Sequence, residues 1–96
     1  TNIIYGVLQN KMRLDHIIAV YSKMPIKKIS SDIMNILRMG IYQALFMDKI
    51  PPYAITNESI KLVKKCRKVS ASGFVNAVLR GVLRNDKEIK TMFLRS

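Results

Sequence analysis

The sequence predicts an all-α domain, and three observations support that prediction. Apolar residues recur at intervals of three and four along most of the 96-residue chain, which is the period of one face of a helix. No run alternates apolar and polar residues as a half-buried strand does. Hydrophobic residues make up 49 % of the chain, against four glycines and three prolines, which indicates a folded core. We therefore expect residues 1–96 to form a single domain, a bundle of about five helices with short connections.

The first two predicted helices are short. The apolar pattern over residues 1–9 indicates a short helix, or the last turns of one, that ends at Asn10. From Leu14 to Tyr21 the apolar residues share one helix face, within a second helix over residues 13–23. This helix must stop before Pro25, because the proline ring disfavours helical geometry in the residue that precedes it.

The strongest helix prediction covers residues 30–48. Ser30 or Ser31 stands where an N-cap is needed, and Asp32 falls in the first turn, where the helix dipole favours an acidic side chain. Gly40 lies within the apolar face, although glycine in a helix costs about 1 kcal/mol relative to alanine. We therefore expect a neighbouring helix to pass too close to Gly40 for a side chain.

Pro51 and Pro52 are predicted to form the corner between the third helix and a fourth. Proline stops the helix before it, and its fixed φ suits the first turn of the helix after it. The fourth helix is expected to run from Tyr53 to Lys68. Cys66 falls on its apolar face, and we interpret this residue as a small buried side chain and not as a reactive thiol.

A fifth helix is expected after Ser70 or Ser72, either of which is placed to cap it. Arg80 and Arg84 are four residues apart and therefore share one side of this helix. A last helical turn or two is expected between Asp86 and Leu94.

Charge is the strongest indication of function. The chain has 17 lysines and arginines against six acidic residues, a formal net charge of +11 at neutral pH. A field of this sign favours a polyanionic partner. Nucleic acid is preferred to a membrane, because no apolar run reaches about eighteen residues and no secretory signal is recognisable. We expect a cytoplasmic protein with no membrane partner.

No catalytic or metal-binding set is expected from this sequence. The four glycines do not cluster into a phosphate or dinucleotide loop. His16 is the single histidine, and Cys66 is the single cysteine, too few for an internal disulfide or a multi-cysteine zinc site. Structural roles are the simpler interpretation of both residues, so we expect no metal and no cofactor in this chain.

The densest basic cluster lies on the predicted fourth helix and is extended by two arginines of the fifth. Lysines on a helix are usually just its solvated face. Here six acidic residues are too few to pair them, which favours contact with phosphate groups. Aromatic residues are few and mostly on apolar faces, so recognition of RNA shape, or binding shared with another domain, is favoured over base stacking. The predicted RNA-binding residues are Lys61, Lys64, Lys65, Arg67, Lys68, Arg80 and Arg84.

A second group of residues is predicted to hold the helices together. Glu58 is expected to pair with Arg38 across the proline corner, and Asn76 to bond a facing backbone group. The predicted structural residues are Arg38, Gly40, Pro51, Pro52, Asn57, Glu58 and Asn76.

The sequence resembles the NusB-like helical domain over nearly its whole length, in the run ILRMGIYQALFMDKIPPYAITNESIKLVKK and the later run SGFVNAVLR. Such domains occur as free transcription antitermination factors and as the N-terminal domain of ribosomal RNA cytosine-C5 methyltransferases of the RsmB (Fmu/Sun) type. GIYQ at residues 40–43 and NAVLR at residues 76–80 look more like the methyltransferase domain. One or two further helices, the first of them rich in arginine, usually begin the family domain, so the resemblance implies an N-terminally truncated bundle.

The resemblance implies an RNA-binding or docking module that is not itself catalytic. In the methyltransferases the S-adenosylmethionine site and the cysteine nucleophile belong to a separate C-terminal domain, so Cys66 does not inherit the nucleophile's role. The implied partners are ribosomal RNA and the catalytic domain of the same chain, with S-adenosylmethionine as the cofactor of the parent enzyme. One alternative is an antitermination factor that binds RNA together with a ribosomal protein. Another is a purely structural domain that packs on a catalytic domain without touching RNA.

Overall fold

The computed structural model describes residues 3–47 and 49–93, and over these residues the protein is all-α, with no strand in either range. Residues 1, 2, 48 and 94, which the sequence predicts to be helical, lie outside the described residues. In chain order the elements are α1 (Ile3–Gln9), α2 (Lys11–Tyr21), the 3-10 turn η1 (Ile26–Lys28), α3 (Ser31–Phe46), α4 (Pro52–Lys65), the 3-10 turn η2 (Val69–Ala71), α5 (Ser72–Arg84) and α6 (Asp86–Phe93).

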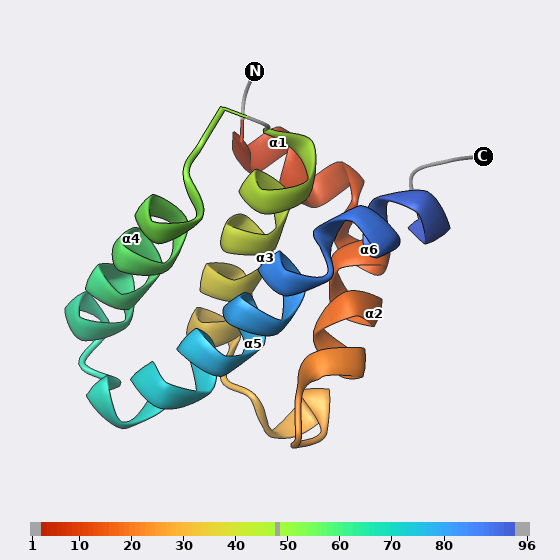
Figure 1. The fold of residues 1–96 in the computed structure, drawn as a ribbon. Coiled ribbons are helices and arrows are strands. Elements are labelled where there is room, and N and C mark those ends of the chain that lie inside the picture. Colours follow the sequence, from red (N-terminus) through yellow and green to blue (C-terminus); the bar gives the residue numbers. More distant parts are fainter. Residues whose placement is uncertain (1–2, 48, 94–96) are drawn as a thin grey trace.

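Helix α3 lies at the centre of the bundle and contacts α1, α2, α4, α5 and α6 (Figure 1). Helices α4 and α5 run antiparallel beside it and are joined through η2 at one end (Figure 1). Helix α2 packs on the other side against α3 and α5. None of the helices in the described ranges is long and apolar enough to cross a membrane.

The core is built from the apolar faces that the sequence predicts. Burial of such side chains is the main source of stability in a bundle of this size, at about 25 cal/mol for each Å² of apolar surface removed from water. The most deeply buried side chains are Leu14, Ile17 and Ile18 of α2, Leu37 and Ile41 of α3, Ile55 and Val63 of α4, and Val75, Val78, Leu79 and Val82 of α5.

The close approach predicted at Gly40 is confirmed. A Cβ atom built on Gly40 of α3 would lie 2.9 Å from Cδ2 of Leu79 in α5 and 3.1 Å from Oγ of Ser59 in α4. Both distances are shorter than an ordinary van der Waals contact, and both neighbouring side chains are buried. Glycine at this position therefore allows three helices to meet at one point.

The proline corner also agrees with the prediction. Helix α3 ends at Phe46 and α4 begins at Pro52, with Pro51 in extended geometry (φ −63°, ψ 144°) as its N-cap residue. Pro52 occupies the first helical position, where its missing N–H would have had no intrahelical partner.

Serine capping is confirmed at one helix and wrong at another. The hydroxyl of Ser30 accepts a hydrogen bond of 3.4 Å from the N–H of Ile33 at the start of α3. Neither Ser70 nor Ser72 caps α5, whose N-cap residue is Ala71. The turn η2 leads directly into α5, and Ala71 already has helical geometry (φ −86°, ψ −4°). A serine side chain caps a helix from a residue whose backbone is extended, and the residue before α5 does not have that geometry.

The fourth helix ends three residues earlier than predicted, at Lys65. Arg67 adopts the left-handed conformation with φ 58°. Its N–H donates to the carbonyl of Lys64 (3.0 Å), and the N–H of Lys68 donates to the carbonyl of Val63 (3.1 Å). These two bonds form a Schellman motif, which usually has glycine at the left-handed position. Cys66 is exposed in this turn, so the prediction of a buried cysteine is wrong.

Candidate nucleic-acid interface

The predicted basic residues all lie on the antiparallel α4–α5 pair or in the turn that joins the two helices. Because the pair is antiparallel, the two ends of the predicted set lie at opposite ends of the pair (Figure 1). Six of the seven are exposed and Lys68 is half-buried. Lys61, Lys64 and Lys65 lie on α4, Arg67 and Lys68 lie in the turn after it, and Arg80 and Arg84 lie in the second half of α5.

A groove that we call the loop groove is lined by the turn after α4 and by the loop that contains η1. It has a volume of about 410 Å³, and none of its lining residues is acidic. Lys28 contributes a third cation to the two from the turn, although the sequence places it about forty residues away, a distance that only the fold closes. Nothing in the helical periodicity indicates this proximity. The polar and aromatic residues of the loop groove are Lys28, Ser30, Arg67, Lys68, Ser70 and Phe74.

A second groove, which we call the arginine groove, lies between the start of α4 and the second half of α5. Its volume is about 490 Å³, and its lining residues again include no acid. Arg80 and Arg84 are both exposed there, and neither forms an ion pair with an acidic residue of the described ranges. The groove is lined by Pro52, Tyr53, Thr56, Asn76, Arg80, Leu83 and Arg84.

Part of the lysine pattern on α4 has a simple structural role. Lys64 and Lys65 lie in the last turn of α4, where the negative end of the helix dipole favours a cation. Lys61 pairs with Glu58 one turn before it. These three lysines are therefore explained in part by the helix itself, whereas the cations of the two grooves are not.

A model of the NusB family matches residues 1–84. The chain belongs to the NusB family. The same residues include both grooves and all of α1 to α5, so the match covers the whole candidate interface.

Some relatives of this NusB-family chain are named as ribosomal RNA methyltransferases and others as transcription antitermination proteins. The chain is 33 % identical over 84 residues to a probable ribosomal RNA small subunit methyltransferase B of Bacillus subtilis, and the match covers 88 % of the chain and 19 % of that protein. It is 35 % identical over 88 residues to the transcription antitermination protein NusB of Dictyoglomus thermophilum, covering 91 % of the chain and 61 % of that protein. A Synechocystis methyltransferase B is 30 % identical over 92 residues, 96 % of the chain and 21 % of its own length. No solved structure matches the chain.

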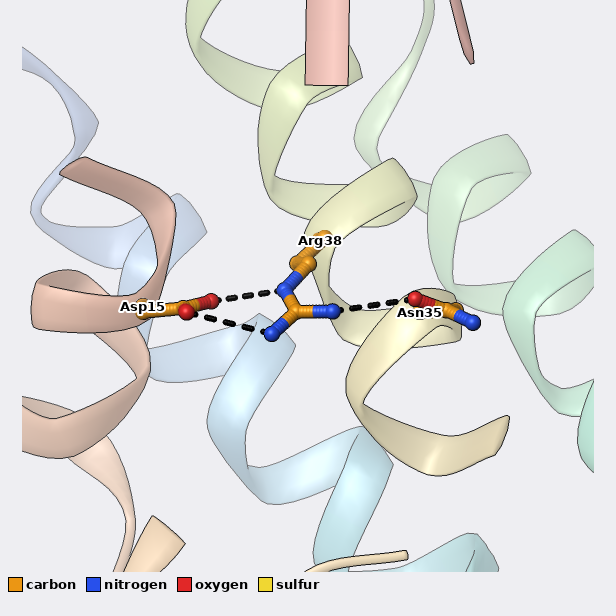
Figure 2. Close-up of polar contacts among 3 residues, drawn as sticks. All are labelled: Asp15, Asn35 and Arg38. Atoms are coloured by element: carbon orange, nitrogen blue, oxygen red, sulfur yellow. Dashed lines mark hydrogen bonds and ion pairs between the residues drawn. The ribbon is translucent and has the colours of Figure 1, made fainter. Parts of the chain in front are cut away.

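The predicted ion pair between Arg38 and Glu58 is wrong. Arg38 of α3 instead binds Asp15 of α2, with Nε–Oδ1 at 2.6 Å and Nη2–Oδ2 at 3.1 Å (Figure 2). Its remaining Nη1 donates to Oδ1 of Asn35 at 3.0 Å. The Arg38 and Asp15 side chains are only 14 % and 29 % exposed, so this bidentate pair links α2 to α3 in a partly dry environment.

Glu58 and its neighbours lie on the solvent side of α4. Ser59 is buried against the core. Each residue of a helix is rotated by about 100° from the one before, so Asn57 and Glu58 lie on a different face of α4 and are exposed. Glu58 accepts a 3.4 Å contact from Lys61, with the two side chains 68 % and 72 % exposed. Asn76 is half-buried at the arginine groove, and the predicted bond to a facing backbone group is not found among the described residues.

Replacing Glu58 with glutamine is expected to change the free energy of unfolding by less than about 0.5 kcal/mol, because exposed pairs contribute little. Urea unfolding followed by circular dichroism measures this change. Asp15→Asn, which weakens the partly buried pair, is the matched comparison and is expected to have the larger effect. A loss above 1 kcal/mol in the Glu58 variant, on the order of a buried pair, would contradict the exposed position of this residue.

Proposed function

We propose that this NusB-family domain binds ribosomal RNA and acts as a non-catalytic docking module of a small-subunit ribosomal RNA (cytosine-C5) methyltransferase. The methyltransferase relatives support this assignment, and the chain matches only 19 % to 21 % of their length. In such a parent the remaining length carries the catalytic domain, its S-adenosylmethionine and its cysteine nucleophile. The parent enzyme would act in the cytoplasm, where ribosomes are made.

The observation that carries RNA binding is the conformation of Arg67. A residue with a side chain in the left-handed region is less stable than glycine by about 1 kcal/mol. Residues held in such conformations cluster at functional sites. Here the conformation places a guanidinium in the loop groove with Lys28 and Lys68, where no acidic residue compensates the charge. A phosphate backbone supplies the missing anions, and arginine is the side chain best suited to bind phosphate in a bidentate manner.

A second candidate function is that of a free antitermination factor. The NusB relative from Dictyoglomus thermophilum supports it, since the chain matches 61 % of that much shorter protein at similar identity. Both functions use RNA binding, so they differ in what the domain is attached to and not in the surface. The reading frame around the chain separates them: several hundred further codons favour the methyltransferase, and a stop codon soon after Ser96 favours the factor.

Replacing Arg67 with glycine is expected to change stability and RNA binding in opposite directions. Unfolding should require about 1 kcal/mol more free energy, because glycine adopts the left-handed conformation without a steric cost. RNA affinity should fall on the order of fivefold at about 0.1 M salt. The negative slope of log K against log salt should become less steep by about 0.7, as expected for one lost phosphate contact. Fluorescence anisotropy with a small-subunit ribosomal RNA hairpin measures both quantities.

Lys11→Ala is the matched control, since it also removes one exposed cation but lies on α2, away from both grooves. It should leave the affinity and the salt slope close to those of the unmodified protein. If Arg67→Gly and Lys11→Ala weakened binding equally, the loop groove would not be the contact surface. If the unmodified protein bound neither this hairpin nor an unrelated one at low salt, RNA binding itself would be wrong.

A further inference from the structure

The arginine groove has a composition that phosphate binding alone does not explain. Arg80 and Arg84 occupy positions four apart on α5, where like charges repel each other across one helical turn. Among the described acidic residues none pairs with either arginine. The pair therefore forms a site of concentrated positive charge in a shallow, open groove, which suits an anionic group.

An exposed aromatic ring stands in the same groove. Tyr53 is 71 % exposed, although it lines a groove whose other wall carries the two arginines. Tyr53 is an exception to the expectation that the aromatic side chains serve mainly the core, which is confirmed for Tyr21, Tyr42, Phe46 and Phe74. Tyr53 lies in the first turn of α4, directly after Pro52. The fixed φ of this proline restricts the backbone at the start of the helix and so holds Tyr53 in place.

Two polar side chains complete the groove and differ in their bonding. The hydroxyl of Thr56 is already used within α4, donating to the carbonyls of Pro52 (3.3 Å) and Tyr53 (3.1 Å). The half-buried amide of Asn76 has no hydrogen-bond partner in the described part of the chain. An amide offers both donors and an acceptor, which is the pattern needed to bond the edge of a base.

We propose that the arginine groove is a subsite for single-stranded RNA, in which a phosphate group lies between Arg80 and Arg84 and an adjacent base stacks on Tyr53. The proposal rests on the RNA binding proposed above and adds a second contact point with a different preference. A base within a double helix is already stacked on its neighbours, so only an unpaired nucleotide can cover the tyrosine ring. An acidic peptide would satisfy the arginines but would leave the exposed ring and the Asn76 amide without a role.

The start of α4 and the end of α5 lie at one end of this helix pair, and the turn that joins the two helices lies at the other (Figure 1). The arginine groove is lined by residues of the first end and the loop groove by residues of the second, so the proposal divides RNA recognition between the two ends. The loop groove offers three cations and a half-buried phenylalanine, and suits phosphate contact with any RNA form. The arginine groove adds an exposed ring and so favours a single-stranded segment.

The test uses fluorescence anisotropy of the protein with a short single-stranded oligoadenosine and with a fully base-paired RNA duplex. Tyr53→Leu should weaken binding to the oligoadenosine about tenfold, whereas Tyr53→Phe should retain it because the ring is kept. Neither variant should change binding to the duplex. The double variant Arg80→Gln/Arg84→Gln should lower the salt slope with oligoadenosine by about 1.4, corresponding to two phosphate contacts. All three positions are exposed, and circular dichroism checks that the variants keep their helices.

Several results would overturn the proposal. One is equal binding of oligoadenosine by Tyr53→Leu and the unmodified protein; another is equal weakening by Tyr53→Leu and Tyr53→Phe. Competition by polyglutamate that depends on the arginines but not on Tyr53 would assign the groove to an acidic protein partner instead. If these variants bind normally while Arg67→Gly binds weakly, the proposed function stands and this subsite fails. If the unmodified protein binds no RNA, both fail.

Discussion

Replacing Gly40 with valine is expected to lower the free energy of unfolding by about 3 kcal/mol, because the new side chain overpacks the centre of the bundle. The first added atom, Cβ, already lies 2.9 Å from Leu79 Cδ2 and 3.1 Å from Ser59 Oγ. Both neighbours are buried and belong to different helices, so any rearrangement of their side chains has to fit among close-packed core residues. The two further methyl groups of valine need more space than Cβ alone, which disturbs the packing around Leu79. Urea unfolding followed by circular dichroism gives the size of the loss.

Alanine variants at two glycines provide the control for this prediction. Alanine is the better helix former by about 1 kcal/mol, so Gly73→Ala, where nothing lies within 4 Å of the added Cβ, should stabilise the protein or leave it unchanged. Gly40→Ala gains the same helix propensity and should nevertheless destabilise. Opposite signs at the two positions would isolate the steric contribution. Stabilisation by Gly40→Ala would mean that the helices do not pass as close as the structure shows.

The features that the sequence predicted correctly are those governed by residues close together in the chain. Gly40 stands out because a glycine within an apolar helix face has a known cost and few explanations. Pro51 and Pro52 likewise impose their geometry on the residues next to them. The apolar faces of α2, α3, α4 and α5 follow from periodicity alone. These local signals were sufficient to predict an all-α bundle.

The turn after α4 was predicted wrongly because its signal is usually a glycine. Arg67 occupies the left-handed position of the Schellman motif, and an arginine there gives no sequence indication that a helix ends. The error carried Cys66 and Lys68 into a helix that stops at Lys65. Arg67 was still among the predicted RNA-binding residues, but the error concealed its left-handed conformation, on which the proposed phosphate contact depends.

The division of the basic residues into two grooves was also out of reach of the sequence. Periodicity tells which residues share a helix face, but it does not tell which loops meet in space. Lys28 joins Arg67 and Lys68 only because the loop that contains η1 and the turn after α4 line the same groove. Tyr53 joins Arg80 and Arg84 only because α4 and α5 run antiparallel. Each groove therefore combines residues that the sequence assigns to separate segments.

The partner of Arg38 shows the same limit, and it leads to the second large effect. Replacing Arg38 with leucine is expected to lower the free energy of unfolding by about 2 kcal/mol, since it leaves the half-buried carboxylate of Asp15 without its bidentate partner. Leucine retains the apolar part of the side chain, so the loss reports mainly on the polar contacts. The partial burial of both side chains means that salt screens the pair only weakly, and the loss should persist at about 0.5 M salt.

A double-mutant cycle distinguishes the ion pair from simple packing. Arg38→Leu and Asp15→Leu each break the pair, whereas the double variant removes both charges and should recover about 1 kcal/mol relative to the sum of the single losses. Asn35 bonds the same guanidinium, so Asn35→Ala added to Arg38→Leu should cost little more than Arg38→Leu alone. If the two single losses simply added in the double variant, the contact between α2 and α3 would depend on the surrounding apolar side chains and not on the pair. Recovery would instead show that Asp15 and Arg38 fix the position of α2 against the central helix.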